Sequence, residues 1–255
     1  MATSRSIVVQ LLVLCAAASF SSAQASLQSQ DGYIRRSGNE WILGTRLVER
    51  RVRLAEGRFL LTSLRNKVSG HECQDGNSPP DEIRFLANGQ DVSASGWRWK
   101  LRSEQARQLA QGELQLDLEL ESSGLRVAKH YVIYPGASVI REWLTLDNAS
   151  DKPVHLSQVD FLHSRVLVTV PQDLELNYLT GGGNYNGSQL LKTEAMSAVY
   201  RRTFDSNGGV QAGAYSSFLP LIFLHNRTTN EGVALGWDYM GHWRFDIGDR
   251  NGSPL

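Results

Sequence analysis

Hydrophobic and polar residues alternate along much of the chain, and the alternation predicts β-strands. The clearest case is residues 113–121, where leucines occupy every second position between polar residues. This pattern indicates a strand with one buried face and one solvated face. Turn residues at 122–124 and at Pro135-Gly136 separate this run from two further strand-like runs, 125–134 and 139–146. Together they predict an antiparallel meander.

The same alternation recurs on both sides of the meander. Runs 47–54 and 58–64 predict a hairpin, because Gly57 can adopt the positive φ that a tight turn needs. Later strands are expected at 154–161, 166–170, 195–204, 218–225 and 232–237. Residues 103–110 have a weakly helical pattern that also fits a polar excursion between strands, and 71–81 and 180–188 have loop compositions. The fold class predicted is an all-β antiparallel sandwich.

Composition and charge narrow the function classes. The chain has 255 residues, 41% of them hydrophobic, which is enough to bury a sizeable core. The 26 basic residues balance the 26 acidic residues, so no basic field is available to attract nucleic acid or an anionic membrane.

Residues 1–25 have the pattern of a secretory signal peptide. Arg5 precedes an apolar run at 7–20, which is too short for a membrane span, and Ala23-Gln24-Ala25 offers a cleavage site after Ala25. We therefore expect a mature domain at 26–255 that is secreted or periplasmic and holds no membrane anchor. Only Cys73 remains after cleavage, so no internal disulfide is expected and the core must supply the stability.

Common catalytic and metal-binding motifs do not occur. The six histidines show neither His-x-His nor His-Glu-x-x-His spacing, so no metal site is expected. The glycines at 181–183 precede neither Lys-Ser nor Lys-Thr, and no Gly-x-Ser-x-Gly elbow is found. No cofactor is expected.

A group of aromatic and polar residues near the end of the chain suggests sugar binding. Trp237, Asp238, His242 and Trp243 lie within seven residues, around Gly236 and Gly241. A pyranose stacks its CH face on an aromatic ring, while fixed polar groups bind its hydroxyls, so these four residues are the candidate substrate-binding residues. The alternative is that both indoles face the core. Trp97 and Trp99 share one face of their segment and are interpreted as packing residues.

Several segments resemble a known family. The run SSFLPLIFL at 216–224, followed by EGVALGWDYMGHW at 231–243, resembles the amino-terminal β-domain of the microbial α-galactosidases of glycoside hydrolase family 36. Segments 131–143 and 60–70 are similar as well, the first reading Tyr-x-x-Tyr-Pro-x-x-x-x-x-Arg-x-Trp. The chain departs from the family pattern at His242, where the family favours Asn.

The resemblance implies a β-supersandwich like that of galactose mutarotase, placed before a (β/α)8 barrel. In the family, two barrel aspartates carry out retaining hydrolysis. This chain lacks the barrel pattern, so no catalytic residue is assigned. The resemblance implies as partners an α-galactoside-like carbohydrate, the barrel of the same polypeptide and further copies in an oligomer. The turn composition at 249–255, directly after an apolar strand, leads us to expect that 26–255 is an incomplete β-domain whose final strands are missing.

Three functions compete at this point. The first is the non-catalytic β-domain of a secreted α-galactosidase-like hydrolase. The second is a free-standing carbohydrate-binding protein that uses residues 237–243. The third is a mutarotase-like epimerase, in which a histidine and a carboxylate exchange protons with a sugar. For that role His163 or His225 would act with Asp160 or Asp238, although no spacing singles these residues out.

Overall fold

The chain is β-structured wherever the computed structural model describes it. The described residues are 26–74, 79–93, 97–160, 162, 173–180, 191–196, 200–206, 218–238 and 241–248. All named elements are strands, all named strand pairs are antiparallel, and no helix in these ranges is long and apolar enough to cross a membrane. The predicted signal peptide at 1–25, the strand at 166–170 and most of the glycine-rich loop lie outside the described residues.

The first sheet has five strands in sequence order. They are β1 (Ser26–Ser29), β2 (Gly32–Ser37), β3 (Glu40–Gly44), β4 (Val48–Ala55) and β5 (Arg58–Asn66). The predicted hairpin is confirmed as β4–β5, and its turn places Glu56 and Gly57 at φ 51° and 77°. Strands β1, β2 and β3 precede the first strand-like run at 47–54, and the sequence pattern did not predict them.

The second sheet has the order β11-β10-β9-β8 and contains the predicted meander. Its strands are β8 (Lys100–Gln108), β9 (Leu114–Ser122), β10 (Leu125–Ile133) and β11 (Ile140–Asn148). Both interpretations of 103–110, a weak helix and a polar excursion between strands, are wrong, because residues 103–108 lie in β8. A register shift between Leu101 and Ser103, together with the largely exposed position of β8, disrupts the alternation that would have indicated a strand.

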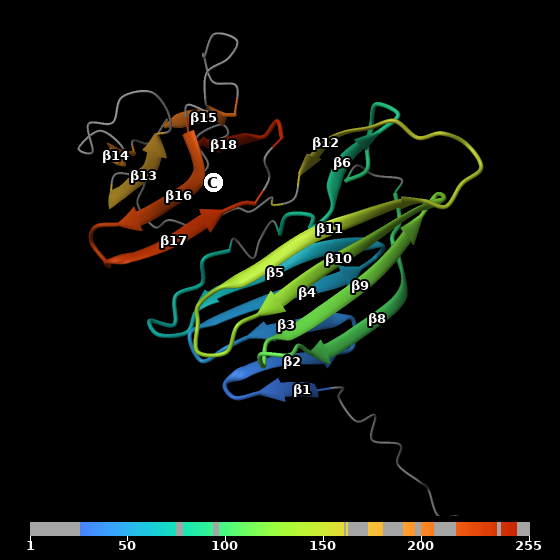
Figure 1. The fold of residues 1–255 in the computed structure, drawn as a ribbon, viewed down its shortest axis with the longest axis horizontal. Coiled ribbons are helices and arrows are strands. Elements are labelled where there is room, and N and C mark those ends of the chain that lie inside the picture. The colour runs from blue at the N-terminus through green and yellow to red at the C-terminus, as the bar shows by residue number, and fades with distance from the viewer. Residues whose placement is uncertain are drawn as a thin grey trace, which may run out of the picture.

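These two sheets pack face to face, and Figure 1 shows them as two layers. Between them lies a continuous core that includes Trp41, Phe59, Leu61, Leu118 and Val127. The alternating leucines of β9 point into this core because successive side chains of a strand point to opposite faces. Trp99 is buried in it and Trp97 packs against it, which confirms their packing role. We call this part the first unit.

A small sheet lies at the end of the first unit and contains the predicted strand near 154–161. It consists of β6 (Arg84–Ala87), β7 (Gln90–Asp91) and β12 (Leu156–Asp160), in the order β12-β6-β7. Arg84 faces the carboxylates of Asp91 and Asp160, at 3.8 and 3.6 Å.

The second unit follows as a separate group of strands (Figure 1), and it has its own core. Its main sheet has the order β14-β13-β16-β17, with β13 (Leu174–Thr180), β14 (Leu191–Ala195), β16 (Phe218–Asn226) and β17 (Glu231–Gly236). A second pair joins β15 (Arg201–Asp205) to β18 (Arg244–Gly248). The predicted strands at 218–225 and 232–237 are confirmed. The single strand predicted at 195–204 is wrong, since β14 ends at Ala195 and β15 begins at Arg201.

Candidate functional site

The two indoles of the predicted sugar-binding group belong to the core of the second unit. Trp237 and Trp243 are both buried, and their rings meet edge to face with centroids 4.7 Å apart. Trp237 also lies parallel to Phe245, at 5.8 Å. Its indole Nε1 is buried without a hydrogen-bond partner in the described part of the chain. Within the described chain the indoles therefore adopt the inward-facing alternative.

The two polar members of the group lie at the surface. The Asp238 carboxylate is almost fully exposed and lies 3.4 Å from the guanidinium of Arg141 at the start of β11. His242 is also exposed. The contact between Asp238 and Arg141 connects the second unit to the second sheet of the first unit, so this predicted site residue lies beside the outer face of that sheet.

A cross-strand row of polar and aromatic side chains occupies this outer face. His130 on β10 lies opposite Asp117 on β9 and opposite Trp143 on β11. The His130 Nδ1 is 2.6 Å from Asp117 Oδ1, and its Nε2 is 3.1 Å from Thr145 Oγ1. The imidazole stacks on the Trp143 indole at 4.7 Å and 14°. We call Asp117, His130, Trp143 and Thr145 the outer-face row.

Asp117 is the charged anchor of the outer-face row. Its partial burial opposes ionisation, but hydrogen bonds from Gln115 and His130 and the positive charge of Arg107 outweigh this and lower the pKa of the carboxyl. The carboxylate therefore fixes one ring nitrogen of His130, while the other nitrogen faces the hydroxyl of Thr145. A ligand hydroxyl would bind His130 Nε2 by replacing the contact with Thr145.

The contact between Asp117 and His130 could have been predicted from the hairpin that contains both residues, although their separation along the chain does not suggest it. Ser122 pairs with Leu125 across the turn, and counting outward from that pair brings Asp117 opposite His130. Because antiparallel neighbours on one face lie within contact distance, the predicted hairpin already implies a histidine–carboxylate pair.

The histidines and carboxylates considered for epimerisation do not pair with one another in the described chain. His163 lies outside the described residues. His225 lies 3.7 Å from Glu175 and 3.1 Å from Asn230. Asp160 faces Arg84, and burial raises the pKa of its carboxyl. The histidine–carboxylate pair with the shortest contact is instead the one in the outer-face row.

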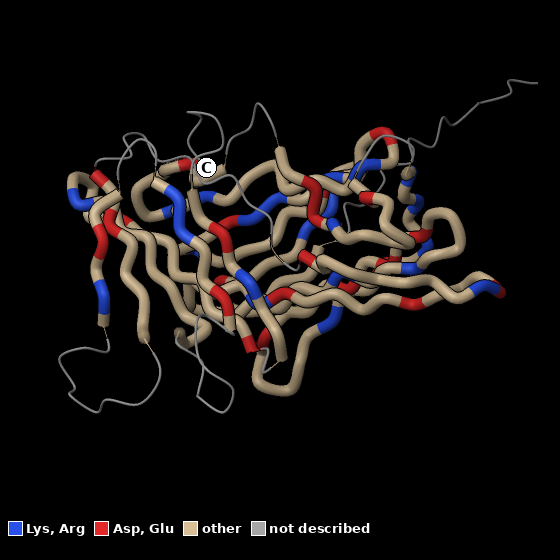
Figure 2. Tube along the Cα trace, turned by 90° about the horizontal axis from the view of Figure 1, so that it is seen from above, with Lys and Arg blue, Asp and Glu red and all other residues tan. Residues whose placement is uncertain are grey.

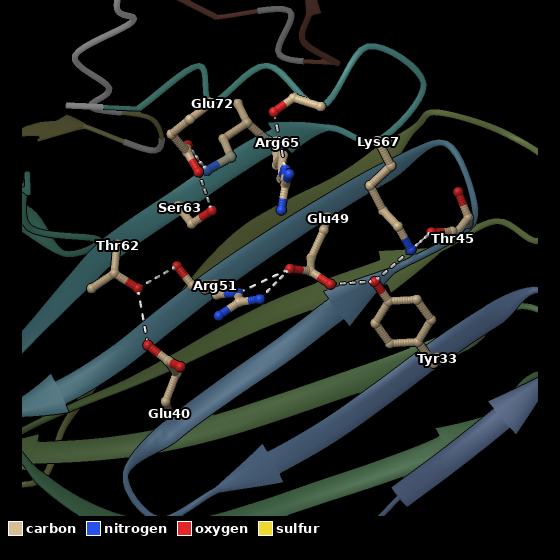
Figure 3. A network of polar contacts seen from close by, with 12 residues as sticks. Tyr33, Glu40, Thr45, Glu49, Arg51, Thr62, Ser63, Arg65, Lys67 and Glu72 are labelled. Atoms are coloured by element: carbon tan, nitrogen blue, oxygen red, sulfur yellow. Dashed lines mark hydrogen bonds and ion pairs between the residues drawn. The ribbon is translucent and has the colours of Figure 1, made fainter. Parts of the chain in front are cut away.

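A second polar network covers the outer face of the first sheet, as Figure 3 shows. The Tyr33 hydroxyl donates to Glu49 at 2.6 Å, Arg51 donates twice to the same carboxylate, and Lys67 donates to the Tyr33 oxygen and to the Thr45 carbonyl. Burial and the hydrogen bond to Glu49 raise the pKa of Tyr33. The hydrogen bonds from Tyr33 and Arg51 outweigh burial and lower the pKa of Glu49. The network holds the segment after β5 against the sheet.

The end of β5 and the segment that follows it also contact the second unit. Asn66 Nδ2 donates to Glu231 Oε1 at 3.3 Å, and His71 Nδ1 lies 2.8 Å from Glu231 Oε2. Glu231 begins β17, so its position is coupled to the sheet that leads to Trp237 and Asp238. The contacts at Glu231 and at Asp238 therefore connect the two opposite ends of β17 to the first unit.

A buried charge network lies inside the first unit, between its two sheets. Arg50 donates to Glu82 at 2.6 Å and to Glu142 at 3.1 Å, while Lys129 lies 2.6 Å from Glu142 and 3.4 Å from Glu82. The Tyr131 hydroxyl donates to Glu82 at 2.7 Å. Two cations thus balance two carboxylates. We interpret the network as structural, because its cations and carboxylates are buried and pair with one another.

Charges of both signs are interspersed along the chain, as Figure 2 shows. Within the ranges that the structure describes, no group of three or more histidine, cysteine or acidic side chains is arranged to hold a metal ion. In the described part of the chain one free thiol is present, that of Cys73, which is half-buried, and burial raises its pKa.

Several solved structures of α-galactosidases have a similar fold. The GH36 α-galactosidase AgaB from Geobacillus stearothermophilus aligns with 86% of this chain and 36% of its own, with a TM-score of 0.59 and 13% identity. AgaA from the same organism aligns with 90% of this chain and 36% of its own, with a TM-score of 0.55 and 13% identity. An α-galactosidase from Lactobacillus brevis aligns with 84% of this chain and 35% of its own, with a TM-score of 0.55 and 12% identity. No protein-family model and no curated protein sequence matches the chain.

This chain has the fold of one part of these α-galactosidases. The predicted resemblance and the predicted all-β antiparallel supersandwich are both confirmed at the level of the fold. The chain spans about a third of the length of the α-galactosidases that it matches.

Proposed function

We propose that this chain is the non-catalytic amino-terminal β-domain of a longer, secreted α-galactosidase-like retaining glycoside hydrolase, and that it supports carbohydrate binding and assembly. The observation that carries the proposal is the fold match, which covers 86% of this chain but only 36% of AgaB. The sequence agrees with this role, because it lacks the alternating strands and helices of a catalytic barrel. Hydrolysis is then assigned to another part of the same polypeptide.

The proposed sugar contacts are the exposed polar groups at the junction of the two units. Asp238 and His242 are accessible, and Arg141 and Trp143 lie on the neighbouring strand β11. Carboxylate, imidazole and guanidinium groups suit the hydroxyls of a pyranose. Trp237 and Trp243 would hold the neighbouring residues Asp238 and His242 in place, because both indole rings pack in the core of the second unit.

The proposal is tested by comparing two proteins on p-nitrophenyl α-D-galactopyranoside. The 255-residue chain alone should show no hydrolysis, whereas the product of the complete reading frame should turn the substrate over. In that complete product, Asp238→Asn should raise KM while kcat stays unchanged, because a contact made equally in ground and transition states affects binding only. Hydrolysis by the 255-residue chain at the rate of the complete product would contradict the proposal.

Export is a second part of the proposal, supported by the composition of residues 1–25. The mature protein should begin at Ser26 and contain one thiol, that of Cys73. Intact-mass measurement of the protein recovered from the medium or the periplasm tests this directly. A protein that retains residues 1–25 and stays in the cytoplasm would contradict export.

A second candidate function, sugar epimerisation, is favoured by the contact between Asp117 and His130. A mutarotase-like reaction needs a histidine and a carboxylate that exchange protons with a sugar, and these two groups are 2.6 Å apart. The test is anomer interconversion of α-D-galactose by the purified chain, followed by polarimetry. His130→Gln should abolish any such activity, and His155→Gln, which changes an exposed histidine elsewhere, should not. Conversion at the uncatalysed rate would eliminate this candidate.

A further inference from the structure

The main sheet of the second unit has two faces of different character. On its inner face, side chains that include Leu176, Tyr178 and Ile222 pack into the core with the β15–β18 pair. On its outer face, the odd-numbered residues of β16 are large and apolar. Leu219, Leu221 and Phe223 are 43%, 44% and 39% exposed. Strand alternation therefore places apolar side chains on both faces of β16.

Neighbouring strands add further apolar residues to this outer face, while Asn177 on β13 and Thr193 on β14 lie beside Phe223 on the same face. Leu191 on β14 is 59% exposed and lies opposite Leu179 on β13. On β17, Gly236 pairs with Leu221, and Ala234 pairs with Phe223. We call the whole set the apolar face, with the members Leu179, Leu191, Leu219, Leu221, Phe223, Gly232, Ala234 and Gly236. It holds four of the seven exposed large hydrophobic side chains in the described chain.

The apolar face has a glycine of β17 beneath the ring of Phe223, and a histidine and a carboxylate border it. A Cβ at Gly232 would lie 2.4 Å from the ring of Phe223, so the ring rests directly on the glycine. The same ring lies nearly parallel to the imidazole of His225. His225 lies 3.7 Å from Glu175 on the neighbouring strand β13. A broad apolar surface with a polar border is typical of a protein–protein interface.

We propose that the apolar face is where the catalytic part of the longer enzyme packs against this domain. This inference rests on the proposed function. It is supported by the alignment with AgaB, in which the larger part of that chain has no counterpart here. Exposed apolar surface of this extent is normally covered, and a sheet face is commonly covered by helices. The small residues of β17 leave room for an element with an apolar stripe, such as an amphipathic helix.

The first experiment establishes whether the apolar face is open in the 255-residue chain. The double variant Leu219→Asp/Leu221→Asp is compared with Val68→Asp, which alters an apolar side chain 75% exposed on the other unit. The double variant should lose about half of the fluorescence of the bound dye ANS, whereas the control should lose little. Size-exclusion chromatography with light scattering should find one chain in every case. A wild-type dimer that the double variant abolishes would assign the face to a second copy and overturn the proposal.

The second experiment uses the product of the complete reading frame and measures hydrogen exchange in β16 and β17. These strands should exchange more slowly in the complete product than in the 255-residue chain, and the double variant should remove the difference. Equal exchange in both proteins, in a complete product that hydrolyses α-galactosides, would overturn the docking surface and leave the proposed function intact. A reading frame that ends after Leu255 would instead overturn both.

Discussion

The two units of this chain differ in how they use their apolar side chains. Among the described residues, the first unit buries nineteen apolar side chains in one core, and both of its outer sheet faces carry hydrogen-bonded charges. The described part of the second unit buries six in its core and leaves Leu219, Leu221 and Phe223 exposed on its outer face. The first unit therefore places most of its apolar side chains between its two sheets, whereas the second unit exposes a row of them on one strand.

The cores also differ in chemistry. The first contains four charged side chains in mutual contact, and the second is built around aromatic rings such as Tyr178, Phe204 and Phe218. A buried charge network depends on every partner, because removing one leaves another unpaired in a medium of low dielectric constant. An aromatic core loses contact area and gains a cavity when a ring is removed. The two units should therefore fail in different ways.

The largest expected effect is in the charge network. Glu82→Gln leaves Arg50 and Lys129 with Glu142 as their remaining charged partner, and should lower the free energy of unfolding by about 3–5 kcal/mol. Urea unfolding followed by far-UV circular dichroism measures this. The matched control is Glu119→Gln on the outer face, where the carboxylate accepts a hydrogen bond from Ser103 at 3.3 Å and little change is expected. Equal effects from the two variants would refute the structural role of the network.

The next effect separates the two units. Phe204→Ala removes edge contacts to Tyr178 and Phe218 and should cost about 3 kcal/mol in the second unit alone. The fluorescence change that reports Trp237 and Trp243 should then occur at lower urea than the loss of the first unit's circular dichroism signal. A single transition that shifts as a whole would show that the units unfold together, and would weaken the contrast between them.

Acidification should affect the first unit through carboxyls whose pKa values folding has lowered. Asp117 and Glu49 are examples, and burial opposes the lowering in both cases. A carboxyl with a lowered folded-state pKa stabilises the fold above its unfolded pKa, and this stabilisation is lost as the pH falls through the folded value. Asp117→Asn should cost about 1 kcal/mol at neutral pH and should flatten the acid limb of the stability curve. An unchanged acid limb would contradict the assigned anchor role.

The smallest effect concerns the contact between the units at Asp238. Because the carboxylate is almost fully exposed, Asp238→Asn should change stability by less than about 0.5 kcal/mol. Glu231→Gln is the comparison, since Glu231 contacts both Asn66 and His71 and its pKa is lowered mainly by a hydrogen bond from Ser69. A larger loss from Asp238→Asn than from Glu231→Gln would show that the junction depends on Arg141.

The sequence predicted those strands whose two faces meet different environments. The leucines of β9 alternate strictly because one face meets the core and the other meets solvent. Strand β8 escaped prediction because it is an edge strand with a register shift and few buried positions. In β16, apolar residues occupy both faces, so the alternation was hidden although the apolar run itself was visible.

The candidate site was predicted less completely, for reasons of distance along the chain. Asp117 and His130 lie in one hairpin, so their contact follows from the turn at 122–124. Glu82, Arg50 and Lys129 come from three separate segments, and no local pattern brings them together. The burial of Trp237 and Trp243 depends on the β15–β18 pair, which covers one face of the main sheet. Exposed and buried indoles give the same sequence pattern.

Whether this chain is one domain of a longer hydrolase can be tested by reading the encoding nucleic acid past the codon for Leu255. We expect a frame that continues for several hundred residues, with alternating strands and helices and with aspartates at strand ends. A stop codon directly after Leu255 would contradict it. Sugar binding or epimerisation by the free-standing chain would then be the function to test.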